Sequence, residues 1–142
     1  MKENINALDE IHKRACMGVD ALSFVLDKVE DKEFKKELEK EYNDYKMIAS
    51  EIEKIYPKYN DDKPHETGMM NKAMTWSEVE MKTINDRSNS KIAELLLNGV
   101  NMGIIEGRRI LNKKEIDGEV SKIVSKYVTM QEESVEILKN YL

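Results

Sequence analysis

Three residues near the start of the chain could bind a metal ion or take part in redox chemistry. Asp9, His12 and Cys16 follow one another at spacings of three and four residues, so a helix would place them on one face. A structural zinc site normally uses two short pairs of ligands, and His65 is the only other histidine in the chain. We therefore expect His12 to be a hydrogen-bonded packing residue and Cys16 to be a small buried apolar residue.

Glu106 is a carboxylate within the most apolar segment of the chain. Such a group needs a partner or access to water, and Arg109, three residues later, is suitably placed to pair with it. We expect that ion pair or exposure to solvent. The alternative is a metal or redox site that combines Glu106 with His12 and Cys16 and holds iron or another transition metal. The prediction is that the protein has no metal and no cofactor.

Gly99, Gly103 and Gly107 follow one another at intervals of four residues in the same segment. Each glycine inside a helix costs about 1 kcal/mol relative to alanine, so three on one face require an explanation. Close packing is the favoured one, since another helix can approach a surface without side chains, and Gly18 is the expected counterpart. The alternative is that the glycines open a small cavity for a ligand.

The composition excludes several classes of protein. The net charge is −5, and acids and bases are interleaved, whereas a nucleic-acid interface or a membrane-surface helix needs a basic face. The apolar runs are too short to span a membrane, and a single cysteine suits the reducing cytoplasm, where we expect the protein to be. The chain carries no phosphate-binding loop, no Gly-x-Ser-x-Gly elbow and no Cys-x-x-Cys motif. A role other than catalysis is therefore favoured.

The spacing of apolar residues predicts an all-α fold, an antiparallel bundle in one domain over residues 1–142. Alternating steps of three and four residues, with few glycines and prolines, predict helices over 4–29, 32–56, 69–85, 90–111 and 114–141. Acids at 30–31, Pro57 and the polar run 86–90 mark the boundaries. Segment 90–111 is apolar on nearly every side, which predicts the central helix.

Two groups of side chains are assigned to packing. The tyrosines of segment 32–56, namely Tyr42, Tyr45 and Tyr56, are expected in the core with their hydroxyl groups reaching solvent. The short helix over 69–85 is rich in methionine, which typically fills irregular gaps, although methionines also bind soft metals such as Cu(I).

The order of the elements is a helical hairpin, a long crossover, a short helix, an apolar helix and a final long helix. Together with local similarities over 17–21, 29–35, 68–76, 85–94 and 103–106, this order resembles the ferritin-like superfamily, in particular its small bacterial helical-bundle domains of unknown function. The resemblance covers nearly the whole chain. It implies an antiparallel four-helix bundle with a short extra helix in the crossover.

The resemblance also identifies which iron ligands are missing. Ferritin-like iron proteins take a Glu from each of two helices and a Glu-x-x-His pair from each of the other two. This chain has no Glu-x-x-His, Met17 stands where related domains often carry an acid, and residues 130–134 contain no histidine. Glu106 is the one carboxylate that matches. The resemblance thus implies a bundle that has lost its di-iron site.

Three functions follow from these features. The first is a non-enzymatic bundle that acts by association, as a homo-oligomer or with a protein partner, and it is motivated by the glycines and the missing ligands. The second is a degenerate metal-binding or redox protein that uses His12, Cys16 and Glu106. The third is a small-molecule binder with its pocket beside Gly103 and the neighbouring glycines.

Overall fold

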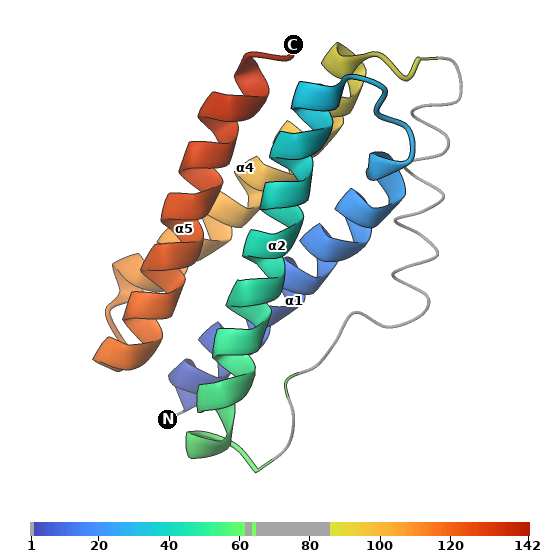
Figure 1. Cartoon of the computed structure of the whole chain (residues 1–142). Coiled ribbons are helices and arrows are strands. Elements are labelled where there is room, and N and C mark those ends of the chain that lie inside the picture. The colour runs from blue at the N-terminus through green and yellow to red at the C-terminus, as the bar shows by residue number, and fades with distance from the viewer. Residues whose placement is uncertain (1, 62–63, 65–85) are drawn as a thin grey trace.

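The computed structural model describes residues 2–61, 64 and 86–142, and within these ranges it is all-helical. Its four long helices are α1 (Lys2–Leu26), α2 (Lys32–Ile55), α4 (Asn89–Lys113) and α5 (Gly118–Lys139), and a short 3-10 helix, η1 (Tyr56–Lys58), extends α2 (Figure 1). The methionine-rich helix predicted over 69–85 and most of the crossover lie outside the described residues. No helix of the described ranges is both long and apolar enough to cross a bilayer.

Polar side chains cap the helices where the sequence predicts boundaries. The backbone N–H of Phe34 donates to the Asp31 carboxylate over 2.8 Å, and the N–H of Lys91 donates to the Ser88 hydroxyl over 3.2 Å. These bonds satisfy amides that have no partner within the helix. Pro57 falls in η1, where α2 ends. The predicted boundaries at Asp31, Pro57 and Ser88 are therefore confirmed.

Two helix ends differ from the prediction by three or four residues, more than the others do. Helix α1 ends at Leu26 rather than at residue 29, and α5 begins at Gly118 rather than at residue 114. Lys114 adopts a left-handed conformation with φ of 55°, which terminates α4, and the Asp117 N–H then donates to the Asn4 side chain over 2.8 Å. The sequence pattern does not predict this turn, because the left-handed position that ends the helix carries a lysine and not the usual glycine.

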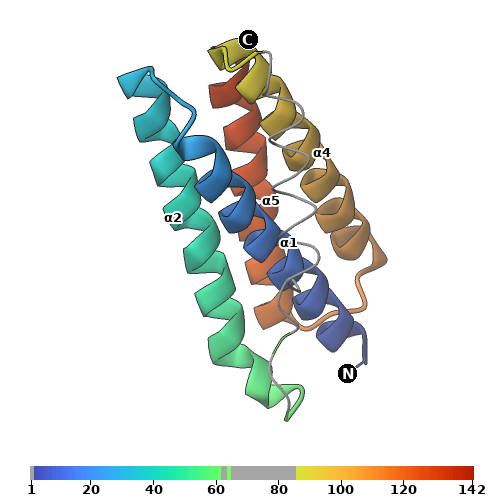
Figure 2. The ribbon, with the colours of Figure 1, turned by 90° about the vertical axis from the view of Figure 1, so that its right-hand side faces the viewer.

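The helices pack as two pairs around one core. Helix α1 lies along α2 and α4 lies along α5, and α5 also contacts α1 and α2. Figure 2 shows the layered arrangement, and in both ribbon views the two termini lie at opposite ends of the bundle. The core draws apolar residues from all four long helices; among those without measurable exposure are Leu8, Ile11, Leu38, Ile48, Ile92 and Val124.

The prediction that segment 90–111 forms the central helix is wrong. Only five residues of α4 are buried: Ile92, Ala93, Val100, Gly103 and Gly107. Met102 and Ile105 are 49% and 45% exposed on its outer side. An apolar residue is buried only where another element covers it, and α1 and α5 each contact the three other long helices, whereas α4 contacts mainly α5. A helix can thus be apolar on all sides and still lie at the surface.

Candidate functional site

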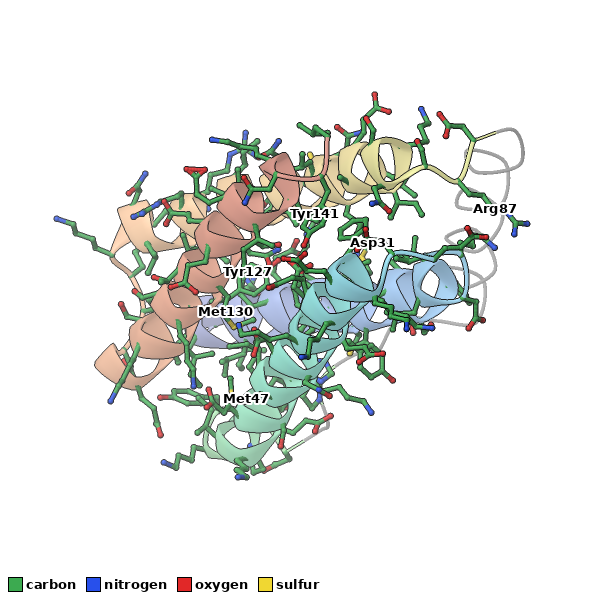
Figure 3. All side chains as sticks on the ribbon, turned by 45° about the horizontal axis from the view of Figure 1, so that its top comes forward. Asp31, Met47, Arg87, Tyr127, Met130 and Tyr141 are labelled. Carbon is green, nitrogen blue, oxygen red and sulfur yellow. The ribbon has the colours of Figure 1, made fainter. Side chains whose placement is uncertain are left out.

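A cavity of about 200 Å³ lies between the four long helices. Every long helix contributes to its wall. The polar side chains that line it are Arg14 of α1, Glu41 and Tyr45 of α2, Asn98 of α4, and Tyr127 and Gln131 of α5. Tyr127 lies on the side of α5 that faces α2 (Figure 3). The cavity therefore has a largely apolar wall into which all four long helices bring a few polar side chains.

Glu41 faces the cavity because it occupies a core position of α2. The buried residues of this helix are Phe34, Leu38, Glu41, Tyr45, Ile48 and Ile52, which follow one another at alternating steps of four and three. That spacing marks one continuous face of a helix. Glu41 stands where the pattern calls for an apolar residue. In α5, Gln131 and Ser134 interrupt the corresponding face in the same way.

A short chain of hydrogen bonds crosses the cavity from α2 to α5. The Tyr45 hydroxyl donates to Oε1 of Gln131 over 2.7 Å, and Nε2 of Gln131 donates to the Tyr127 hydroxyl over 3.3 Å. Burial raises the pKa of Tyr45 well above its ordinary value and that of Tyr127 to about 12, so both phenols stay neutral. These contacts correct one expectation, because the Tyr45 hydroxyl bonds inside the core and does not reach solvent. The Tyr56 hydroxyl likewise donates to Asp9 over 2.8 Å.

Glu41 has no such partner. Its residue is 8% exposed, and within the part of the chain that the structure describes its carboxyl group forms no hydrogen bond or ion pair. Burial raises its pKa to about 8, and the neighbouring Asp44 and Glu37 carboxylates add to this shift against the opposing effect of Lys40. At neutral pH the group is therefore mostly protonated, and it ionises at mildly alkaline pH.

The rest of the cavity wall is apolar and includes two glycines, Gly18 and Gly99. Met17 and Leu22 come from α1, and Leu95, Leu96 and Val100 come from α4. A Cβ atom added to Gly99 would meet nothing within 4 Å, so this glycine faces open space. Of the three glycines spaced four residues apart in α4 (the glycine ladder: Gly99, Gly103 and Gly107), Gly99 therefore fits the pocket hypothesis.

The other glycines serve close packing. A Cβ atom at Gly103 would collide with the Tyr127 hydroxyl and would lie 2.9 Å from Nε2 of Gln131, and one at Gly107 would collide with Val128. The packing hypothesis thus fits these two positions, and their neighbour is α5. Gly18 is not the counterpart on α1 that we expected, because the Tyr45 ring of α2 would lie 2.7 Å from its Cβ atom. The space beside Gly103, Gly107 and Gly18 is thus filled by side chains of adjacent helices, not by a second glycine surface.

His12 is buried in α1 and has partners on two sides. Its Nε2 atom lies 3.2 Å from Oε1 of Glu53 on α2. The Cys16 sulfur lies 3.8 Å from its Nδ1 and 4.0 Å from its Nε2. Nearly equal distances to two ring nitrogens mean that the thiol is not aimed along one lone pair, so the pair lacks the geometry of an activated nucleophile. The expected hydrogen-bonded His12 is confirmed, whereas Cys16 is only partly buried.

Glu106 is separate from this pair. It forms the expected ion pair with Arg109, whose Nη1 atom lies 3.0 Å from its carboxylate. Across residues 2–61, 64 and 86–142, no three His, Cys, Asp or Glu side chains gather as they would to hold a metal ion. The metal alternative stays a prediction, and elemental analysis of protein from metal-supplemented cells tests it.

Sequence patterns missed the polar residues of the cavity. Glu41, Gln131 and Arg14 belong to no motif, and Tyr45 and Tyr127 read as ordinary core aromatics. A signal was nevertheless present, since Glu41 and Gln131 each interrupt an otherwise regular buried face. Two interruptions on different helices meet only when the helices are packed. What the arrangement can do is bind a small molecule that has both a polar and an apolar part.

Comparisons of this chain with protein-family models, with curated proteins and with solved structures found no match. The ferritin-like resemblance therefore stays a prediction, and the function is argued from the cavity itself.

Proposed function

We propose that this protein binds a small organic molecule in the cavity between its four long helices. The observation that carries the proposal is Glu41, a buried carboxyl group that faces a cavity of about 200 Å³ without a partner among the described residues. An apolar cavity of about 150 Å³ is large enough for benzene, so this one suits a ring with a short polar arm.

A carboxyl group in this position is costly for folding. An ionised carboxylate that is largely withdrawn from water and has no partner pays a desolvation penalty. An apolar side chain at position 41 would continue the core face formed by Leu38 and Tyr45. Groups that are unfavourable for folding concentrate at functional sites, which supports a binding role for Glu41.

Filling the cavity tests the proposal. Leucine at Gly99 would enlarge a residue of the cavity wall without a clash at its Cβ atom, whereas leucine at Gly118, which also meets nothing within 4 Å, lies outside the cavity wall. We expect cyclohexylmethanol, a neutral probe of suitable size, to bind the natural protein and the Gly118→Leu variant, as measured by calorimetry or NMR titration. The Gly99→Leu variant should lose this binding. Equal binding by both variants would contradict the proposal, as would failure of the natural protein to bind this alcohol and also its amine and carboxylate analogues.

We further propose that the bundle is antiparallel and ferritin-like. Support comes from the short connections within the pairs α1–α2 and α4–α5 and from the long crossover between the pairs. The colour gradient of Figure 1, which follows the chain up α1, down α2, down α4 and up α5, agrees with this order. A crystal structure that placed α4 beside α2 instead of α5 would contradict it.

Self-association is a second candidate function, and the exposed apolar residues of α4 favour it. Met102 and Ile105 lie three residues apart, so they share one side of the helix. A two-fold dimer needs only one surface that matches itself, and a second copy of this chain is the occupant we propose. Sedimentation at high micromolar concentration tests this, with Met102→Glu expected to dissociate the dimer. A strict monomer at that concentration would rule out self-association.

A further inference from the structure

The basic side chains near Glu41 pair with other acids, so Glu41 itself has no cationic partner among the described residues. Lys40, its neighbour in α2, pairs with Asp44 over 3.2 Å, and Arg14 of α1 pairs with Glu10 over 3.1 Å. Both cations near the cavity thus already have acidic partners. The ionisable groups that interact with Glu41 are Glu37, Lys40, Asp44 and Tyr45, all of α2. Arg14 of α1 and Tyr127 of α5 line the same cavity, and the α4 wall carries no ionisable group.

The hydrogen-bonding groups of the cavity can accept from a ligand that donates. The Tyr45 hydroxyl gives its proton to Gln131, and the Gln131 amide gives one of its protons to Tyr127. The oxygens of Tyr45 and Gln131 keep lone pairs that can accept further hydrogen bonds. A ligand with several N–H groups would use these acceptors together with the Glu41 carboxylate.

We propose that the ligand is a small organic cation, an alkylammonium compound, whose charged group pairs with Glu41 while its hydrocarbon part lies against Leu22, Leu95, Leu96 and Val100. This proposal rests on the small-molecule binding proposed above and names the chemical class. A bare divalent metal ion is a poorer occupant, because such ions need several oxygen ligands and the cavity wall supplies one carboxylate. Where Glu41 is ionised, it and its acidic neighbours Glu37 and Asp44 would repel an organic anion.

Binding of a cation should displace a proton. Free Glu41, with a pKa of about 8, is mostly protonated at pH 7, whereas the pair with an ammonium group requires its ionised form. Binding at pH 7 should therefore release a proton from most of the protein molecules. Calorimetry in two buffers of different ionisation enthalpy measures this release in the natural protein and needs no variant.

Three probes of matched shape test the class of ligand: cyclohexylmethylamine, cyclohexylmethanol and cyclohexanecarboxylate. At pH 9 the amine is charged, like a lysine side chain of pKa about 10.4, and Glu41 is largely ionised. We expect the amine to bind the natural protein at least about tenfold more tightly than the alcohol, one charged hydrogen-bonded contact being enough for that factor. Glu41→Gln should abolish the preference, and Glu39→Gln, the same change at an exposed position of α2, should keep it.

Each outcome has a distinct meaning. If the amine and the alcohol bind equally, or if the carboxylate binds best, the cation proposal is wrong and small-molecule binding stands. If none of the three probes binds the natural protein, the proposed function itself fails. Binding of the amine without release of a proton at pH 7 would also overturn the pairing with Glu41, even if the Glu41→Gln variant did not fold.

Discussion

Replacing Glu41 with glutamine should make the protein more stable at alkaline pH and change it little at acidic pH. Glutamine has nearly the same shape but cannot ionise. In the folded protein burial raises the pKa of Glu41 from 4.5 to about 8, chiefly through loss of solvation. Between these two pH values the folded chain holds a proton on Glu41 that the unfolded chain has released, so the free energy of unfolding falls as the pH rises.

The size of the effect follows from the shift in pKa. The free energy of unfolding of the natural protein should fall by about 1.4 kcal/mol for each pH unit between 4.5 and 8, which gives about 5 kcal/mol as an upper bound. The Glu41→Gln variant lacks this contribution. Its advantage over the natural protein should be small at pH 5 and should approach a few kcal/mol at pH 9. In urea, that difference moves the midpoint by roughly 1–2 M.

Urea unfolding of the two proteins at several values between pH 5 and pH 9 measures this difference. Other titrating groups act on both proteins and cancel in the comparison. Glu39→Gln, at an exposed position of the same helix, is the control and should give a flat difference within about 0.5 kcal/mol. A flat curve for Glu41→Gln as well would show that the carboxyl group is solvated, and the argument for the binding site would fail with it.

Three further predictions concern packing, a buried hydrogen bond and a helix cap. Gly103→Ala should destabilise the fold by about 1–3 kcal/mol, because its methyl group meets the rigid Tyr127 ring, whereas Gly99→Ala should stabilise it by up to about 1 kcal/mol, because alanine favours helix and nothing lies nearby. Thermal unfolding of the two variants measures both effects, and equal effects would contradict the conclusion that Gly103 is closely packed and Gly99 is not. Tyr45→Phe should cost about 1–3 kcal/mol in urea unfolding, because the buried Gln131 oxygen loses its donor, and no loss would mean that water replaces the bond. Asp31→Ala should cost about 1 kcal/mol through loss of the α2 cap, measured in the same way, and an unchanged midpoint would show that the cap does not stabilise the helix.

The sequence by itself determined the helical class and most of the helix boundaries. Steps of three and four between apolar residues require helices, and Asp31, Pro57 and Ser88 define ends through local bonding that depends on adjacent residues only. The ion pair of Glu106 with Arg109 is local in the same sense, since one turn of helix brings the two side chains together.

Only the tertiary structure decided which residues form a site. Helix α4 has apolar residues on all sides, yet only those that another helix covers are buried, and Met102 is exposed. The glycine ladder is regular in sequence, but Gly99 faces a cavity while Gly103 supports Tyr127, because only the neighbour across the gap distinguishes them. Glu41 and Gln131 are far apart in the chain, and helix packing alone brings them to one cavity. Local periodicity shows which side of each helix turns inward, whereas a cavity is a property of several helices at once.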